Sequence, residues 1–251
     1  MSSYQNILNH VRKWEGGLVY HESEGQWTNR GVQWKTYKQL APKLLGIKNP
    51  TLAEFKKLSA SDADKFIIQF WNTATNNSAI INQASANAFF EMLWGGSTWG
   101  IKWLQKVIGV YPDGKVGAKT VAAANNYPPN ILLDEVLVRY EHLAKVNPSK
   151  YGEFINGWRN RWNDLYNNSK KYFSEFKMED LPQVLVKGKK KSKVIIFILI
   201  GLIGSYFVWP HIHVALLGIV FFYLGIRIFN FSTFEEYKED RVKLLLKLSK
   251  W

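Results

Sequence analysis

The chain has 251 residues, carries a net charge of +13 and contains no cysteine, which excludes disulfide bonds and thiolate metal sites. Residues 1–178 hold +8 of this charge and nine of the eleven tryptophans. This part of the chain therefore favours an anionic partner, which could be a nucleic acid, an acidic membrane face or an anionic cell-wall polymer.

A helix is expected at the start of the chain, where apolar residues recur at three- and four-residue steps up to Trp14. It ends at Gly16-Gly17, with Glu15 in its last turn. Residues 18–34 lack a helical period and are expected to form a long loop or a short irregular hairpin. Because no alternating strand pattern of any length appears, the sequence predicts an all-α fold. Further helices are expected over 35–45, 51–58, 61–74, 84–94, 98–108, 118–125, 130–145 and 151–176.

The C-terminal part is organised differently. Residues 178–193 form a linker that ends in the basic run KGKKKSK, and two apolar runs follow within 194–229. Each run has about 16 residues, or roughly 24 Å as a helix, and Pro210 lies in the break between them. We therefore expect a two-helix transmembrane hairpin in a lipid bilayer, with self-association through it. Residues 230–251 suit a short amphipathic tail on the membrane surface, or equally an ordinary exposed helix.

Glu15 is the candidate centre of chemistry. A carboxyl group at the C-terminal end of a helix feels the negative end of the helix dipole, and shielding by Trp14 and Trp27 would remove it from water. Both effects favour the protonated acid, which is the form that a general acid for glycoside cleavage needs near neutral pH. The alternative is a solvated glutamate at a helix end, with no role in catalysis.

The motifs around Glu15 resemble a known family. WEGGLVY (14–20), TNRGV (28–32) and then Tyr37 resemble glycoside hydrolase family 108, a group of N-acetylmuramidases that are often phage lysins. FWNTATNN (70–77) matches an aromatic segment of that family, and residues 86–126 look like its peptidoglycan-binding lobe, closed by FINGWRNRW (154–162). The resemblance covers about residues 4–170. It implies a lysozyme-like two-lobed helical domain, with a catalytic lobe over 1–80 and a peptidoglycan-binding lobe over 81–177.

The same resemblance implies roles for particular residues. Glu15 would be the general acid, and Glu24 would be the second carboxylate, with Glu22 as the alternative in the same loop. Thr28 and Asn29 would position the attacking water or a sugar amide, or else cap the next helix. The chain departs from the family where Trp14 replaces a histidine, where Trp27 replaces an acidic residue and where the intervening loop is one residue shorter.

Aromatic residues near these motifs are expected to line a sugar groove. Trp27, Trp34 and Tyr37 would stack on the glycan, with Trp14 and Gly31 also in contact with substrate. Five further tryptophans fall at helical spacings and are expected in the core: Trp94, Trp99, Trp103, Trp158 and Trp162. The five histidines have no metal-ligand spacing, so neither a metal nor another cofactor is expected.

The sequence therefore predicts a membrane-anchored peptidoglycan hydrolase, used in phage lysis or wall penetration. The alternatives are a non-catalytic peptidoglycan-binding tether of a virion or injection machine, and a pore-forming hairpin with a wall-targeting domain. A nucleic-acid partner is set aside because no zinc motif, basic zipper region or solidly basic helix face is present. The positive-inside rule places both ends of the hairpin in the cytoplasm of a bacterial inner membrane. The domain would then act after the membrane is breached, be delivered from outside, or cross despite this charge pattern.

Overall fold

The computed structural model describes residues 1–22 and 25–175, which are mostly helical, as the sequence predicts. The helices are α1 (Tyr4–Trp14), α2 (Trp34–Leu44), α3 (Leu52–Lys56), α4 (Ala60–Thr75), α5 (Gln83–Val107), α6 (Ala118–Asn125), α7 (Pro129–Val146), α8 (Pro148–Tyr151) and α9 (Ile155–Ser169), followed by the 3₁₀ turn η1 (Lys170–Glu175). Side-chain caps begin several of them: Ser3 caps α1, Thr51 and Glu54 form a capping box on α3, and Ser59 caps α4.

The predicted linker, hairpin and tail (178–193, 194–229 and 230–251) lie outside the described residues. Within the described part of the chain, no helix is both long enough and apolar enough to cross a bilayer.

Residues 18–33, for which the sequence predicts a long loop or a short irregular hairpin, form a small antiparallel sheet, which agrees with the second alternative. It consists of β1 (Leu18–His21), β2 (Gln26–Asn29) and β3 (Val32–Gln33), in that order. Asn29 pairs with Val32 across a two-residue turn, in which Arg30 and Gly31 have φ angles of 50° and 78°. Two positive φ angles are typical of the type I′ turn that suits the twist of a tight hairpin. Strands of two to four residues are too short to show an alternating pattern, which explains why the sequence could not decide between a loop and a hairpin.

Helix α5 contains a sharp bend that the sequence anticipated as two separate helices. Ser97 adopts φ 54° and ψ −157°, a region that is almost confined to glycine, and it interrupts the helical geometry. After the bend Gly100 packs directly on the carbonyl of Met92, where a Cβ would lie 2.0 Å from the oxygen. The bend is therefore possible only because residue 100 has no side chain.

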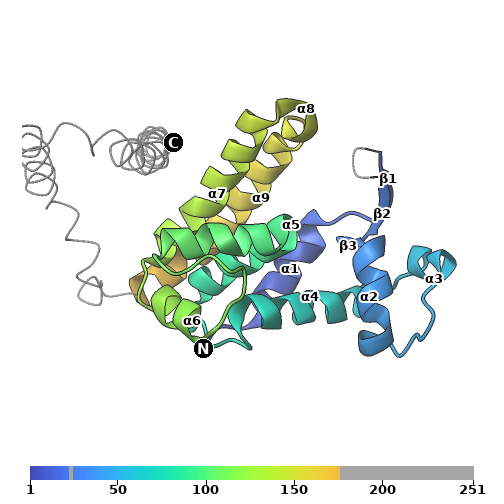
Figure 1. Ribbon diagram of the computed structural model, residues 1–251, viewed down its shortest axis with the longest axis horizontal. Coiled ribbons are helices and arrows are strands. Elements are labelled where there is room, and N and C mark those ends of the chain that lie inside the picture. The colour runs from blue at the N-terminus through green and yellow to red at the C-terminus, as the bar shows by residue number, and fades with distance from the viewer. Residues whose placement is uncertain (23–24, 176–251) are drawn as a thin grey trace, which may run out of the picture. The chain divides into compact units, whose positions relative to one another are not determined.

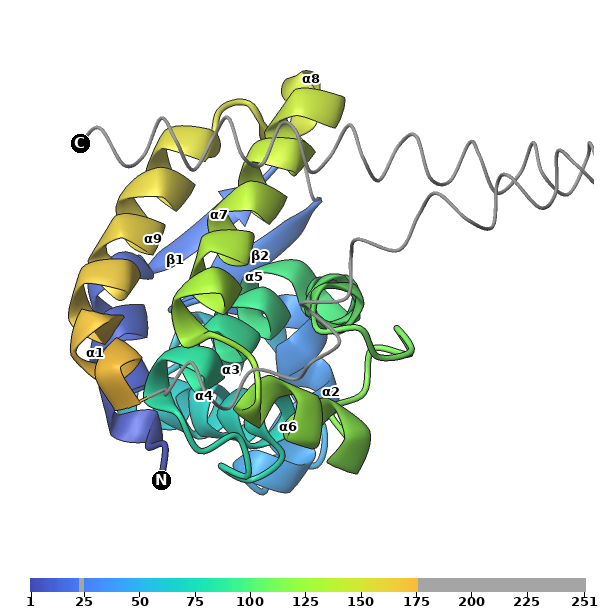
Figure 2. The same cartoon turned by 90° about the vertical axis from the view of Figure 1, so that its left-hand side faces the viewer.

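Two groups of helices meet along α5. Helix α5 packs on α4 on one side and on α7 on the other, while α7 and α9 run side by side and are joined at α8 (Figure 1 and Figure 2). Helix α1 contacts both α4 and α9. The C-terminal end of α1 is thus surrounded by elements from distant parts of the chain.

Not all of the tryptophans predicted as core are buried. Trp162 is 7% exposed and donates its indole N–H to the carbonyl of Leu133, as a core residue should. Trp99, in contrast, is 66% exposed at the bend of α5, so its prediction was wrong. Helical spacing alone did not reveal that the bend turns this side chain outward.

Candidate functional site

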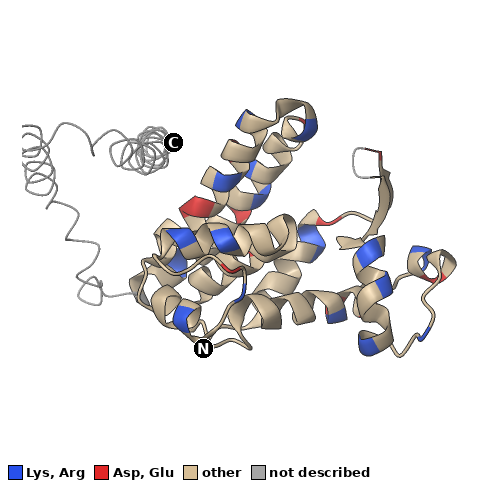
Figure 3. Cartoon of the chain, viewed as in Figure 1, with Lys and Arg blue, Asp and Glu red and all other residues tan. Residues whose placement is uncertain are grey.

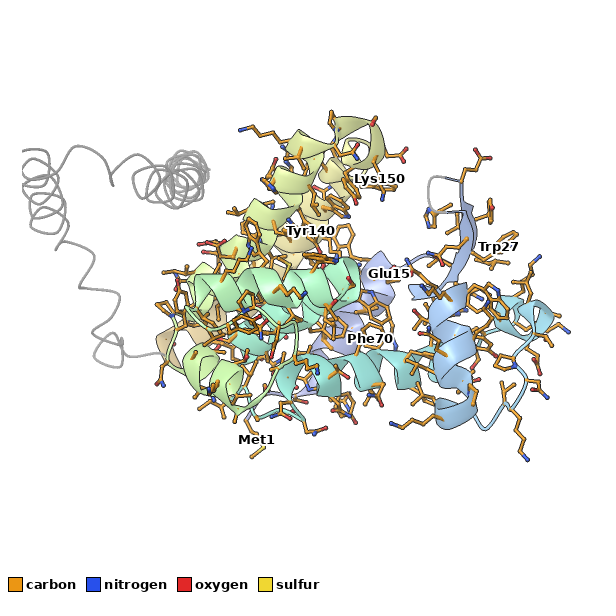
Figure 4. The ribbon with its side chains drawn as sticks, in the orientation of Figure 1. Met1, Glu15, Trp27, Phe70, Tyr140 and Lys150 are labelled. Atoms are coloured by element: carbon orange, nitrogen blue, oxygen red, sulfur yellow. The ribbon has the colours of Figure 1, made fainter. Side chains whose placement is uncertain are left out.

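Glu15 immediately follows α1 and is its C-cap. The backbone N–H of Glu15 still donates to the carbonyl of Val11 at 2.8 Å, but its own backbone is extended (φ −91°, ψ 121°). The buried face of α1, which includes Ile7, Leu8 and Val11, fixes the helix against its neighbours. The Glu15 carboxyl group is therefore held at a fixed end of a packed helix, where it contacts α5, α9 and the turn between β2 and β3 (Figure 4).

Gly31 of the Thr-Asn-Arg-Gly motif packs against the Glu15 side chain. A Cβ on Gly31 would lie 2.8 Å from Cδ and from Cγ of Glu15, and 2.7 Å from Cζ2 of Trp94. Only glycine fits in this space, and its φ of +78° is also one that glycine tolerates best. The two motifs that the sequence singled out are thus in direct contact, although Gly31 touches Glu15 itself and not a groove for substrate.

One oxygen of Glu15 has two partners. The indole Nε1 of Trp94 donates to Oε1 at 2.8 Å, and Nη1 of Arg161 forms an ion pair with the same oxygen. Among the described residues no hydrogen bond is made to Oε2. Trp94 is held in turn by Phe70 and Phe90, whose ring centroids lie 5.1 Å and 5.7 Å from its own. The carboxyl group is therefore oriented through Oε1.

Arg161 also binds a second, completely buried carboxylate. Its Nη2 donates to Oε2 of Glu91 at 3.1 Å, and its Nε lies 2.7 Å from Oε1 without the alignment of a hydrogen bond. Burial alone would raise the pKa of Glu91, but Arg161, His10 and two hydrogen bonds outweigh burial and lower it. The hydroxyl of Tyr140 donates to Oε1 of Glu91 at 3.0 Å, and burial together with that carboxylate raises the pKa of Tyr140 well above its usual value.

A third carboxylate, Asp164 of α9, fastens α9 to α1. Its oxygens accept from Nε1 of Trp14 at 2.9 Å and from Nδ1 of His10 at 3.1 Å, and it is ion-paired with Lys13. Burial would raise the pKa of Asp164, but these hydrogen bonds lower it. The indole N–H of Trp14 therefore links α1 to α9, and its predicted contact with substrate stays a prediction.

A small pocket lies beside Glu15 on the side of α4. Its volume is about 50 Å³, which suits a few water molecules but not a sugar ring. It is lined by Val11, Arg12, Glu15, Arg30, Ala60, Ala63, Asp64 and Ile67. Asp64 thus lines the same pocket as Glu15, and Arg12 forms a bidentate ion pair with Asp64. Sequence reasoning had no basis for choosing Asp64, which lies on a helix far from the motifs.

The aromatic residues predicted for a sugar groove are placed elsewhere. Tyr37 is 1% exposed and packs against Phe55 and Phe66, so its ring has no free face for a sugar, and the prediction was wrong. Trp34 is half-buried against the same core. Trp27 packs against it too, and its ring lies 5.2 Å from that of Tyr20 on β1, in a tilted arrangement, with Nζ of Lys56 at 4.4 Å. Figure 4 shows Trp27 apart from Glu15.

Thr28 and Asn29 face opposite sides of β2. The amide of Asn29 donates to the carbonyls of Phe55 and Lys56, at 2.9 Å and 3.3 Å, and its side chain is buried. Asn29 therefore clamps α3 to the sheet, which differs from the predicted contact with water or a sugar amide. Because side chains alternate along a strand, Thr28 points away from α3. Neither residue caps the next helix, whose N-cap is Gln33.

The predicted second carboxylate, Glu24, lies outside the described residues, and Glu22 is exposed. Sequence reasoning missed Glu91 and Arg161 and placed Trp94 in the core. One signal was present: Glu91 is the only charged residue in the apolar helical stretch ANAFFEMLW, and a charge in such a stretch is rarely buried without a partner. Within the described part of the chain, no cluster of histidine and carboxylate side chains could hold a metal ion.

Comparisons with known proteins give one match to a family model and one similar fold. Residues 99–163 match the family described as "Predicted Peptidoglycan domain". The fold resembles the structure of Brucella abortus SagA, with a TM-score of 0.55 and 24% identity over 67% of this chain and 94% of SagA. No curated protein matches the chain. The matched segment includes α6, α7, α8 and Arg161, so a part of the chain that is similar to this family contacts Glu15.

Proposed function

We propose that the protein is a peptidoglycan hydrolase of the muramidase type that cleaves the glycan strand with Glu15 as general acid. The observation that carries this proposal is the arrangement at Glu15. Its carboxyl group is fixed through Oε1 by Trp94 and Arg161, and it lines a pocket beside residues of α4. Arg161 belongs to the segment that matches the peptidoglycan family, so the candidate acid lies next to the glycan-directed part of the chain.

The proposed hydrolysis uses one proton, from Glu15, and one water molecule. Glu15 gives its proton to the glycosidic oxygen, the bond from that oxygen to the anomeric carbon breaks, and water adds to this carbon. The unpaired oxygen of Glu15, Oε2, is the one available to the substrate. A second carboxylate removes the proton of the water; Asp64 in the same pocket and Glu24 are the two candidates. The size of the pocket matches a water site beside a glycan that binds outside it.

We further propose that residues 194–229 anchor the enzyme in a bacterial membrane as a hairpin with both ends in the cytoplasm. The hydrolase then reaches peptidoglycan once that membrane is breached, as in phage lysis, or when a virion or injection apparatus delivers it. Lys and Arg are spread over several helices of the described part and do not gather on one (Figure 3). This distribution suits diffuse attraction to an anionic wall polymer.

A zymogram on purified cell walls tests the proposal. The 251-residue chain, purified in a mild detergent, is compared with Glu15→Gln and with Glu153→Gln, the same substitution at an exposed glutamate that has no assigned role. We expect wild type and Glu153→Gln to clear the wall, and Glu15→Gln to bind it without clearing. Normal clearing by Glu15→Gln would remove Glu15 from the mechanism.

A second candidate function is a non-catalytic tether that grips peptidoglycan. The ion pair between Glu15 and Arg161 favours it, because a carboxylate engaged in this way can serve as a structural link between α1 and α9. Retention of wild-type protein on wall fragments, with no release of reducing ends at any pH, would support the tether and contradict the hydrolase.

A further inference from the structure

The ion pair at Glu15 raises a physical problem for a general acid. A general acid must carry a proton, whereas a guanidinium beside a carboxyl group favours the charged carboxylate. Arg161, however, does not belong to Glu15 alone. It makes one contact to Glu15, through Nη1, and two to Glu91, through Nη2 and Nε.

The charges of Glu91 and Arg161 neutralise each other inside the protein. The side chain of Glu91 is 0% exposed and that of Arg161 is 13% exposed, so each charge needs a partner inside the protein. When Glu15 takes up a proton, Arg161 still has Glu91 as its counter-ion, and no buried charge is left alone. If Glu91 were neutral, protonation of Glu15 would leave Arg161 as an uncompensated buried cation, which is unfavourable.

We propose that Glu91 is a positioning residue that acts as the permanent counter-ion of Arg161 and thereby allows Glu15 to hold the proton that it donates. This inference rests on the proposed function of Glu15. Glu91 does not touch the substrate; it acts through Arg161, while the hydroxyl of Tyr140 donates to Oε1 of Glu91 and fixes its carboxylate.

The other charged and titratable groups around the site cannot replace Glu91. On α1, burial lowers the pKa of His10, which favours the neutral ring, and on α7 the raised pKa of Tyr140 keeps its hydroxyl neutral. In the pocket, Asp64 of α4 is paired with Arg12. Arg30, in the turn between β2 and β3, is exposed, and its charge is screened by solvent. Glu91 is therefore the buried negative charge that offsets Arg161 when Glu15 is neutral.

Three variants of the full-length chain test the inference: Glu91→Gln, which removes the charge at nearly constant shape; Glu91→Asp, which keeps it; and the double variant Glu91→Gln/Arg161→Gln, which removes both charges. The first readout is the rate of wall clearing against pH. The second is the titration of the Glu15 carboxyl carbon by ¹³C NMR, assigned with Glu15→Gln. Circular dichroism checks that each variant is folded.

In Glu91→Gln, Arg161 has only Glu15 as a counter-ion, so Glu15 loses its proton at lower pH. The alkaline limb of the rate profile and the NMR midpoint should both move down by about one pH unit, roughly a tenfold loss of rate above the limb. Glu91→Asp should keep the limb in place, and the double variant should return it toward the wild-type position. A purely structural role of Glu91 predicts that Glu91→Gln lowers the rate of wall clearing without moving the alkaline limb. It also predicts that the double variant clears walls more slowly than Glu91→Gln. Either result would overturn the inference. If the wild type clears no wall, the proposed function fails, but the NMR midpoint still decides the role of Glu91.

Discussion

Replacing Gly31 by alanine tests the contact between the two motifs most directly. The new Cβ would lie 2.8 Å from Cδ and Cγ of Glu15 and 2.7 Å from Cζ2 of Trp94, so the side chains must move apart. The φ of +78° adds a cost of about 1–2 kcal/mol for a residue with a Cβ, and overpacking adds about 1–3 kcal/mol. We therefore expect a loss of about 2–5 kcal/mol in the free energy of unfolding.

Two matched controls separate these contributions. Gly109 has a φ of +76° but no neighbouring atom within 4 Å of an added Cβ, so Gly109→Ala should show only the backbone cost of about 1–2 kcal/mol. Gly17 has neither a positive φ nor a close neighbour, so Gly17→Ala should have little effect. Urea denaturation followed by tryptophan fluorescence measures all three. If Gly31→Ala costs no more than Gly109→Ala, the close packing of Gly31 on Glu15 is refuted.

Two further predictions concern the buried charges. Arg161→Met leaves the carboxylate of Glu91 uncompensated and should lower the free energy of unfolding by about 3–5 kcal/mol. Arg159→Met breaks a pair with Glu141 and a hydrogen bond to Asn156 at the surface, and should cost less than about 1 kcal/mol. Equal costs in urea denaturation would contradict the burial argument. Burial lowers the pKa of His10 below its usual 6.5, so the unfolded chain takes up a proton at higher pH than the folded chain, and stability is lost as the pH falls below 6.5. His10→Gln should therefore flatten the dependence of the free energy of unfolding on pH between pH 7 and pH 5. An unchanged slope in this range would contradict the assigned role of His10.

The helices could be predicted from the sequence because their signals are local. The periodic segment at 61–74 became α4 (Ala60–Thr75), and the segment at 130–145 became α7 (Pro129–Val146). The segment at 151–176 is instead divided among α8, α9 and η1. The sheet was predicted only as one of two alternatives, an irregular hairpin, because its strands are very short. These differences concern boundaries and short elements, where a local pattern has too few residues to be decisive.

The site could be predicted only in part, for a physical reason. Glu15 and Gly31 could be singled out because their motifs are contiguous in sequence, and the structure brings the two into contact. The partners of Glu15 come from positions 79 and 146 residues later, and no local spacing encodes an ion pair over that distance. Tyr37 could have been recognised as core, because it and Ala41 share one face of α2 at the helical interval of four and both are buried.

The geometry also bears on how the wall-associated segment relates to the candidate acid. Residues 99–163 match the peptidoglycan family, yet Arg161 from that segment reaches Glu15, and Asp164 just beyond it binds His10 and Trp14 of α1. A shift of α9 would therefore disturb both the ion pair at Glu15 and the anchoring of α1. Because Glu15 takes its orientation from Trp94 of α5 and Arg161 of α9, the first 80 residues alone cannot complete the site.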